Sequence, residues 1–360
     1  MSIVKPRIVT DPVEATMIKK TIFIIALVIA LLGGAMASKA PAAETSEGPH
    51  LEIYGFVQLD AIYDFDRVDP SWSAALRPSK IPVNCPADPG CGKDGETIFS
   101  VRQTRFGVKA GAPTALGELN TKFEFDLFGV GADAGQTTIR LRHAYGELGQ
   151  FLAGQTNSLF MDGDVFPNTI EYWGPIGMIF FRNLQLRWTP YNAQGAKVSV
   201  ALEGPGSGVD AGNVNNPEGW KGWNHYPDVT AQFRADQPWG HAQVAGIVRW
   251  LGFENPTNSG ITKDSGNVIG GGVNVSGSLK TVGKDKLLAQ IAYGKGIASY
   301  INDCCVDVAP NDALNDGEAV PLLAWLVYYD HYWSDRWSSS VGYSMADQDN
   351  TGGQNPNAFH

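Results

Sequence analysis

Apolar and polar side chains alternate from residue 51 onward, and this period of two constrains the fold more than any other feature of the sequence. Between residues 119 and 127 the polar positions are Asn120, Lys122, Glu124 and Asp126, and the positions between them are mostly apolar. Such alternation predicts β-strands with one face in an apolar medium and the other in water. It suits the wall of a membrane barrel, and equally a half-buried strand of a soluble sandwich.

The lengths of the connections separate these two alternatives. We expect thirteen strands, at residues 51–65, 96–111, 117–129, 136–148, 149–156, 176–190, 194–204, 226–236, 239–253, 266–280, 286–299, 318–332 and 335–347. Most alternate connections are long, whereas those between them are brief turns. Short periplasmic turns that alternate with long external loops are typical of up-and-down outer-membrane barrels. The sequence therefore predicts an all-β, transmembrane, antiparallel barrel.

Thirteen is an odd number, and single-chain bacterial barrels have even numbers of strands. Residues 349–360 are polar and, by the alternation, fall in an external loop. We therefore expect a barrel of sixteen strands, of which about thirteen are present, so that residues 51–360 form a barrel that is incomplete at its C-terminus. The alternative is that one weak strand has been miscounted.

The N-terminal region has the pattern of a secretory signal peptide. Lys19 and Lys20 precede an apolar stretch at residues 22–32, and Ala35-Met36-Ala37 supplies a small-residue cleavage site. We expect residues 1–37 to be removed and residues 38–50 to be a linker, with Met17 as a second candidate start. The alternatives are cleavage after Ala43 and a retained anchor helix, although the apolar stretch is shorter than the roughly 20 residues of a membrane span.

Composition agrees with an exported membrane protein. Charged residues make up 18% of the chain, and the formal net charge is −10. An acidic chain lacks the basic excess that neutralises phosphates, so no nucleic-acid partner is expected. Aromatic residues near strand ends, such as Trp188, Trp239 and Trp333, suit the two interfaces of a bilayer. The expected partner is therefore the lipid of an outer membrane.

Several segments together resemble the DcaP-like porin family of outer-membrane proteins. They are residues 54–64, 104–108, 117–129, 141–146 and 151–162, in this order along the chain. The resemblance is good over residues 51–190 and looser beyond them. It implies a sixteen-stranded, trimeric porin that allows passive diffusion of small anionic solutes such as dicarboxylates.

Strand phase indicates which charged residues face the water-filled interior. If the apolar positions face lipid, the inward set is Arg105, Lys122, Glu124, Asp126, Arg140, Arg142, Arg187 and Arg249. Arg102 and Arg105 have opposite phases, and the apolar neighbours of Arg105 favour it as the inward one. A guanidinium is always charged and binds carboxylates in bidentate fashion, so this wall would attract anions. The alternative is that the arginines only neutralise wall carboxylates.

The long connection at residues 157–175 is unusually apolar for an external loop. General porins fold the loop at this position into the barrel, and by that resemblance Asp162, Asp164 and Glu171 would be acidic residues of a constriction. The alternative is an external loop packed on the rim or at a trimer contact.

Four cysteines in an exported chain predict disulfides. The spacing of Cys85 and Cys91 within one loop suits a small loop-closing bridge. Cys304 and Cys305 are adjacent, and their pairing is left open.

Signatures of other functions are weak. Gly342-Tyr-Ser-Met-Ala346 imitates a nucleophile elbow but lies within an alternating strand. The six histidines show no metal-ligand spacing, and no dinucleotide motif is present. We therefore expect no enzyme activity, no cofactor and no metal. The rival functions are a barrel enzyme of the phospholipase or protease type, which would need a serine or aspartate beside a histidine, and a surface adhesin.

Overall fold

The computed structural model describes residues 48–83, 85, 91, 94–171, 173–213, 220–254, 265–303 and 305–355. All of these belong to one compact unit, residues 43–360. The expected signal peptide at residues 1–37, and almost all of the expected linker, lie outside the described residues. No helix among the described residues is long and apolar enough to cross a membrane.

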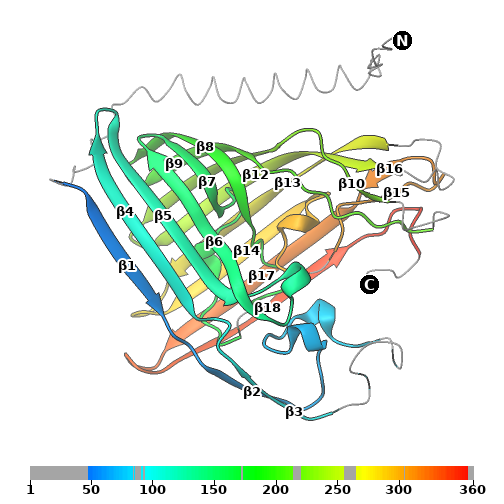
Figure 1. The fold of residues 1–360 in the computed structure, drawn as a ribbon, viewed down its shortest axis with the longest axis horizontal. Helices are drawn as coiled ribbons and strands as arrows, with labels where there is room; N and C mark the ends of the chain where they lie inside the picture. Colours follow the sequence, from blue (N-terminus) through cyan, green and yellow to red (C-terminus); the bar gives the residue numbers. More distant parts are fainter. Residues whose placement is uncertain are drawn as a thin grey trace, which may run out of the picture. The chain divides into compact units, whose positions relative to one another are not determined.

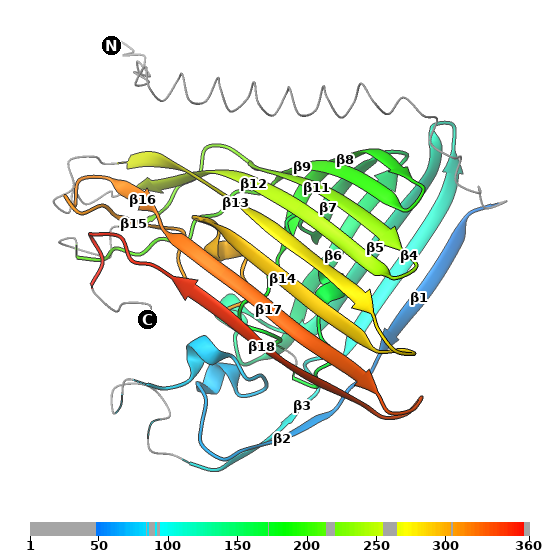
Figure 2. The ribbon, with the colours of Figure 1, turned by 180° about the vertical axis from the view of Figure 1, so that it is seen from behind.

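Thirteen strands pair in one antiparallel path (Figures 1 and 2). In order along the sheet they are β1 (His50–Phe56), β4 (Arg105–Thr114), β5 (Gly117–Phe128), β6 (Thr137–Leu148), β7 (Phe151–Asn157), β8 (Arg182–Ala193), β9 (Ala196–Glu203), β11 (Asp228–Gln237), β12 (Gly240–Glu254), β13 (Ser265–Lys280), β14 (Lys286–Lys295), β17 (Pro321–Tyr332) and β18 (Ser338–Gln348). Successive strands of this path are neighbours in the sheet, as an up-and-down barrel requires. Among the described residues no pairing joins β1 to β18, and the total of sixteen strands remains a prediction.

The remaining elements are short and lie in the long connections. The strands are β2 (Asp60–Asp64), β3 (Glu96–Ser100), β10 (Lys221–Gly222), β15 (Val308–Pro310) and β16 (Gly317–Ala319), and the 3₁₀ turns are η1 (Pro70–Trp72), η2 (Pro78–Lys80), η3 (Gly131–Asp133), η4 (Gly163–Val165) and η6 (Ala298–Tyr300). The connections after β4, β6, β8, β11, β13 and β17 span two to five residues, and those on the other side are longer. The predicted alternation of turns and loops is therefore confirmed.

The prediction of single strands at residues 51–65 and 96–111 is wrong. Each is divided, and β2 and β3 pair with each other in a separate two-stranded sheet. The two strands are interrupted beside each other, where Gln58 N donates to Thr104 Oγ1 at 3.2 Å. In the second strand, Thr104 N donates to Val101 O at 3.0 Å, which forms a turn. The strand expected at 176–190 starts only at Arg182, because residues 176–181 belong to the preceding loop.

The two faces of the sheet differ as the alternation predicts. Large apolar side chains on one face are exposed, for example Ile139 at 67% and Tyr293 at 60%, and they form the outer surface that faces hydrocarbon. The positions between them point to the opposite, inner face. Exposed Trp239, Trp333 and Trp337 lie in or beside short turns, where an interfacial aromatic belt is expected.

Side-chain packing is concentrated on part of the inner face rather than between layers. The loop of residues 158–181 and the loop of residues 296–320 lie against the inner side of the wall that contains β12, β14 and β17 (Figure 2). Their buried cluster includes Phe160, Ile179 and Tyr300 from the loops and Ile247 and Leu322 from the strands. The inner face is thus apolar where loops cover it, contrary to a uniformly polar interior.

Candidate functional site: a basic wall facing an infolded loop

Neighbouring strands β4, β5 and β6 carry a ladder of opposite charges on the inner face. Arg105 lies directly across from Asp126, and Asp126 lies across from Arg140. The adjacent row, Phe106, Phe125 and Leu141, faces outward. The inward phase predicted for Arg105, Asp126 and Arg140 is thus what the structure shows, because charged and apolar rows alternate along the same strands.

Two arginines hold the two carboxylates of this wall. Arg140 binds Asp126 in bidentate fashion, with Nε to Oδ1 at 3.0 Å and Nη2 to Oδ2 at 2.6 Å. Arg142 joins both acids, with Nε to Glu124 Oε1 at 2.7 Å and Nη1 to Asp126 Oδ2 at 3.0 Å. These charge-assisted hydrogen bonds fix the side chains of both acids.

Glu124 has further partners on its other side. Tyr54 OH donates to Glu124 Oε2 at 2.7 Å, and Lys122 Nζ lies 3.2 Å from the same oxygen. Tyr54 reaches Glu124 across Gly107, where a Cβ atom would overlap the tyrosine ring, so glycine is required at this position. Arg105 and Lys122 remain partly exposed, with side chains at 27% and 23%.

Arg182 joins this group and was not predicted from the sequence. It is the first residue of β8, its guanidinium lies 5.2 Å from the centre of the Phe180 ring, and it is near enough to Arg140, Arg142 and Asp126 to interact with them electrostatically. Among the described residues the guanidinium has no hydrogen-bonded or ion-paired partner. By simple alternation Arg182 would face outward, as Leu184 does two residues later. Its side chain instead follows the preceding loop and lies with the inward-facing charges.

We call Arg105, Lys122, Arg140, Arg142 and Arg182 the basic wall. Five basic side chains surround two carboxylates, Glu124 and Asp126. Glu124 and Asp126 are buried and fully occupied by hydrogen bonds, so the excess positive charge faces the interior.

The other two predicted pore arginines differ from this group. Arg187 is half-buried and donates to Gln185 Oε1 at 2.9 Å and to Asn157 O at 2.7 Å, so it supports the start of the infolded loop. Arg249 points inward, but it is 1% exposed and pairs with Asp228 at 2.9 Å and Asp307 at 2.8 Å. The prediction that Arg249 lines open space is therefore wrong, because the loop that carries Asp307 covers it.

Arg102 also points inward, although strand phase favoured only Arg105. The strand breaks between the two residues, and Arg102 is buried over the Phe128 ring at 3.9 Å, where it donates to Gly129 O at 2.9 Å. The groups that it binds are backbone carbonyls, so it supports the loop between β5 and β6.

Residues 158–181, which we call the infolded loop, cross the inner face. The loop leaves β7 and returns to β8, whose terminal residues Asn157 and Arg182 pair, yet it contacts strands far along the sheet. Inward-facing amides and a hydroxyl hold its backbone. Asn274 Nδ2 donates to Phe160 O at 2.8 Å, and Gln243 Nε2 donates to Met161 O at 3.1 Å. At Gly177, the carbonyl accepts from Gln290 Nε2 at 3.1 Å and the amide donates to Ser344 Oγ at 2.7 Å. A loop in this position, inside the sheet and attached across from the basic wall, is suited to constrict a channel.

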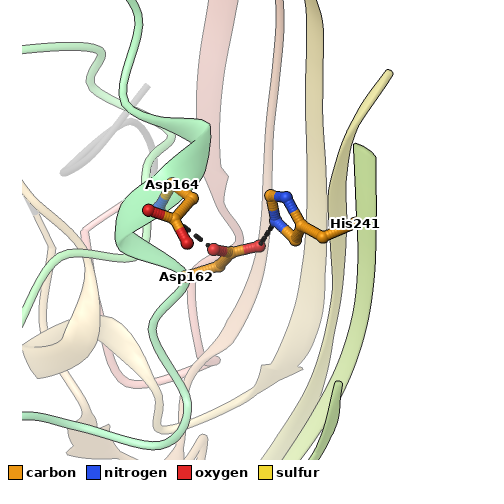
Figure 3. A group of neighbouring side chains, drawn as sticks. All are labelled: Asp162, Asp164 and His241. Carbon is orange, nitrogen blue, oxygen red and sulfur yellow. Dashed lines mark hydrogen bonds and ion pairs between the residues drawn. The ribbon is translucent and has the colours of Figure 1, made fainter. Parts of the chain in front are cut away.

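Asp162 attaches the infolded loop to β12 and β13, as Figure 3 shows for its contact with His241. Its Oδ2 lies 2.7 Å from His241 Nε2 and accepts from Ser276 Oγ at 2.7 Å. Burial alone would raise the pKa of Asp162, but the hydrogen bonds from His241 and Ser276 outweigh it and hold the pKa below its usual value. At 1% exposed, Asp162 does not line a pore surface as predicted.

Asp162, Asp164 and His241 come close enough together to hold a cation, although the sequence showed no metal-ligand spacing. Arg234 already supplies the positive charge there, with Nη1 3.3 Å from Asp162 Oδ1 and Nη2 2.7 Å from Asp164 Oδ2. A second cation beside this guanidinium would be repelled, so the cluster acts as an ion-paired attachment point.

Glu171, the third predicted acid, binds backbone rather than facing open space. Its carboxylate accepts from Leu76 N at 2.8 Å and Gly174 N at 3.0 Å, and so joins the infolded loop to the first long loop. Burial raises the pKa of Glu171, and the backbone donors only partly oppose this effect. Of the three acids only Asp164 is exposed, and its charge is paired with Arg234.

The first long loop is fastened to the same region. The Arg77 guanidinium lies over Trp72 at 4.3 Å and Trp173 at 4.8 Å, and it binds buried Asp303 at 2.6 Å. Cys85 and Cys91 form a disulfide in this loop. Cys305 is also disulfide-bonded, and Cys304 lies outside the described residues.

Comparison with known structures gives the fold. The structure is similar to the outer membrane channel DcaP of Acinetobacter baumannii, with a TM-score of 0.67 and 21% identity over 86% of this chain and 82% of that one. OmpF of Salmonella typhi in complex with daunomycin scores 0.49 at 11% identity, over 83% of this chain and 79% of that one. OmpT of Vibrio cholerae has a TM-score of 0.48 and 13% identity, over 85% of this chain and 78% of that one.

No curated protein sequence matches the chain. The family model described as DcaP outer membrane protein matches residues 33–288, which is more than half of the sequence. This match confirms the resemblance found in the sequence and places the chain in the outer membrane. The chain belongs to the DcaP outer membrane protein family, a family of porin-type outer-membrane channels.

Proposed function

We propose that this protein is a diffusion channel that prefers small anionic solutes, and among them dicarboxylates. The observation that carries the proposal is the basic wall, in which five basic side chains surround two carboxylates that are already hydrogen-bonded. Arg182, which has no hydrogen-bonded or ion-paired anion among the described residues, supplies charge that a passing carboxylate can neutralise.

Dianions are favoured over monoanions because the available cations come from separate strands. Arg105, Lys122 and Arg182 belong to three different strands, and each can offer a separate contact to a solute. A guanidinium binds a carboxylate through two parallel hydrogen bonds, and a solute with two carboxylates can engage two cations at once. Binding stays weak because Arg105 and Lys122 are partly solvated, as passage through a channel requires.

The remaining parts of the proposal concern the assembled protein. We propose removal of residues 1–37 on export, sixteen strands in the complete barrel, and a homotrimer in the membrane. The basic pair and apolar stretch before Ala37 support the first, and the family resemblance supports the other two. Porin-type channels are in general not enzymes, in agreement with the absence of enzyme activity expected from the sequence.

Single-channel recording of the full-length protein in planar bilayers tests the proposed selectivity. We expect stepwise ohmic conductance, a reversal potential that reports anion preference, and interruption of chloride current by succinate. Arg182→Gln should lower the anion-to-cation permeability ratio by about two-fold or more, because one cation is lost from the basic wall that faces the solute path.

Arg336→Gln is the matched control, because Arg336 is an exposed arginine in the short turn between β17 and β18. It should leave the ratio unchanged. A wild-type channel that prefers cations, or an Arg182→Gln channel with the wild-type ratio, would contradict the proposal.

A further inference from the structure

A polar side chain interrupts the apolar outer face of β7. Phe151, Ala153 and Gln155 share that face, and Gln155 lies between Ala144 of β6 and Leu184 of β8. Leu184 is 61% exposed, so this row faces hydrocarbon. An amide in such a place is costly unless it hydrogen-bonds within the protein, because lipid offers no partners.

The wall is irregular beside Gln155. Phe125 pairs with Leu141 and Glu124 pairs with His143, so Arg142 has no partner on β5 and is the extra residue of a β-bulge. A bulge leaves backbone groups of its strand without ladder partners. Pairing of β6 with β7 begins only at Ala144, so Leu141 and Arg142 lie beyond the paired part of these two strands.

The Gln155 side-chain amide supplies a hydrogen-bond donor to the backbone carbonyls at this bulge. Its Nε2 donates to Leu141 O at 3.2 Å and lies 3.5 Å from Arg142 O. On the other face of the same bulge, the Arg142 side chain binds Glu124 and Asp126. One bulge therefore adds a cation to the inner face while the outward phase of Leu141 and the inward phase of His143 are kept.

We propose that Gln155 is a positioning residue for anion selection: from the lipid-facing side it holds the bulge that directs Arg142 into the basic wall. The link to selection depends on the function proposed above. The positioning of Arg142 does not, and it can be tested separately.

Gln155→Met removes the donor at nearly constant volume. We expect the anion-to-cation permeability ratio to fall by about two-fold, as for loss of one wall cation, with single-channel conductance little changed. Thr121→Val is the matched control, because Thr121 also faces outward and its Oγ1 donates to Ala110 O at 3.2 Å, but in a regular part of the ladder. It should leave the ratio unchanged.

The direction of the side chain at position 142 is measured with Arg142→Cys, since the described cysteines are all in disulfides. An anionic thiosulfonate added to the aqueous phase should modify the introduced thiol. Adding Gln155→Met should slow this reaction by about ten-fold, because a relaxed bulge no longer points the side chain inward. The slower modification is expected even if the wild-type channel does not prefer anions. Failure of the selectivity proposal can therefore be distinguished from failure of the proposed role of Gln155.

Deletion of Arg142 completes the test. It restores a regular register between Leu141 and His143, so no freed carbonyls remain and Gln155→Met should have no further effect on folding or on the ratio. If Gln155→Met fails to fold, the deletion should rescue it. An introduced thiol at position 142 whose reactivity is unchanged by Gln155→Met, or equal effects of Gln155→Met with and without Arg142, would overturn the proposal.

Discussion

At the scale of single residues, identical side chains on the inner face have different roles, and burial decides which. Arg105 is partly exposed beside Glu124 and can meet a solute, whereas Arg249 is enclosed between Asp228 and Asp307. The same holds for the acids, since Asp162 is an attachment point and Asp164 is exposed. A charge that is already paired in a low-dielectric setting contributes to architecture, because releasing it costs several kcal/mol.

Asp162→Asn is expected to destabilise the protein by about 3 kcal/mol at neutral pH, because it leaves His241 and Arg234 without their buried anionic partner. The pKa of Asp162 is lowered in the folded protein. Its contribution to folding stability is therefore complete at pH values above the ordinary aspartate pKa of about 4, and it is lost as the pH falls through the lowered pKa. Denaturant unfolding of wild type and variant should therefore differ by a constant amount between about pH 6 and pH 8, and converge below about pH 4. A difference that does not shrink in acid would contradict this role.

At the scale of elements, both polar and apolar inward-facing residues of the opposite wall hold the infolded loop. Amides and hydroxyls such as Asn274 and Gln243 bind its backbone, and apolar Ala245, Ile247 and Ala292 pack against its side chains. A loop fixed only by hydrogen bonds could exchange them for water, whereas buried apolar contacts cannot be replaced in this way. The apolar part of the inner wall thus strengthens the attachment of the loop.

Phe160→Ala should loosen this attachment. Phe160 is fully buried among these residues and packs edge-to-face against Tyr300 at 5.9 Å, so truncation should cost about 3–5 kcal/mol of unfolding free energy. In bilayers we expect larger and noisier single-channel currents, because the loop would leave the wall intermittently. Phe123→Ala, on the outer face, is the control and should keep the wild-type conductance. Equal currents from all three proteins would show that the loop does not set the conductance.

At the scale of the whole molecule, an acidic chain presents a basic interior surface. The net charge of the sequence is −10, yet the inner face of β4 to β6 and the start of β8 carries more basic than acidic side chains. Solutes respond to the charges near their path, since charges beyond a Debye length are screened. Overall charge therefore gives no guide to the selectivity of the channel.

Anion preference should accordingly depend on salt. The screening length falls from about 30 Å at 0.01 M to about 3 Å at 1 M, so partly exposed Arg105 and Lys122 should attract anions strongly only in dilute solution. Reversal potentials measured at a fixed salt gradient should show the permeability ratio declining toward the free-solution value as mean concentration rises. A ratio that does not vary with salt would indicate selection by pore size instead.

The alternation of side chains determined the outer face, the order of the strands and the inward phase of Arg105 and Arg140, because a strand has only two faces and lipid tolerates only one kind of residue. Turn and loop lengths determined which ends of the strands lie together, and family motifs added the identity of the barrel. Each of these properties depends on residues that are close in the sequence.

Tertiary structure decided what covers each inward residue. Alternation could not show that Arg249 lies under the loop carrying Asp307, that Asp162 meets His241, or that Arg182 turns in with the basic wall. Nor could it show that one strand is divided at Gln58, or that a bulge at Arg142 is held by Gln155. Burial and pairing of these groups depend on contacts between distant segments, such as the 79 residues that separate Asp162 from His241. Period-two patterning carries no information about such contacts, because it reports only which face of its own strand a residue occupies.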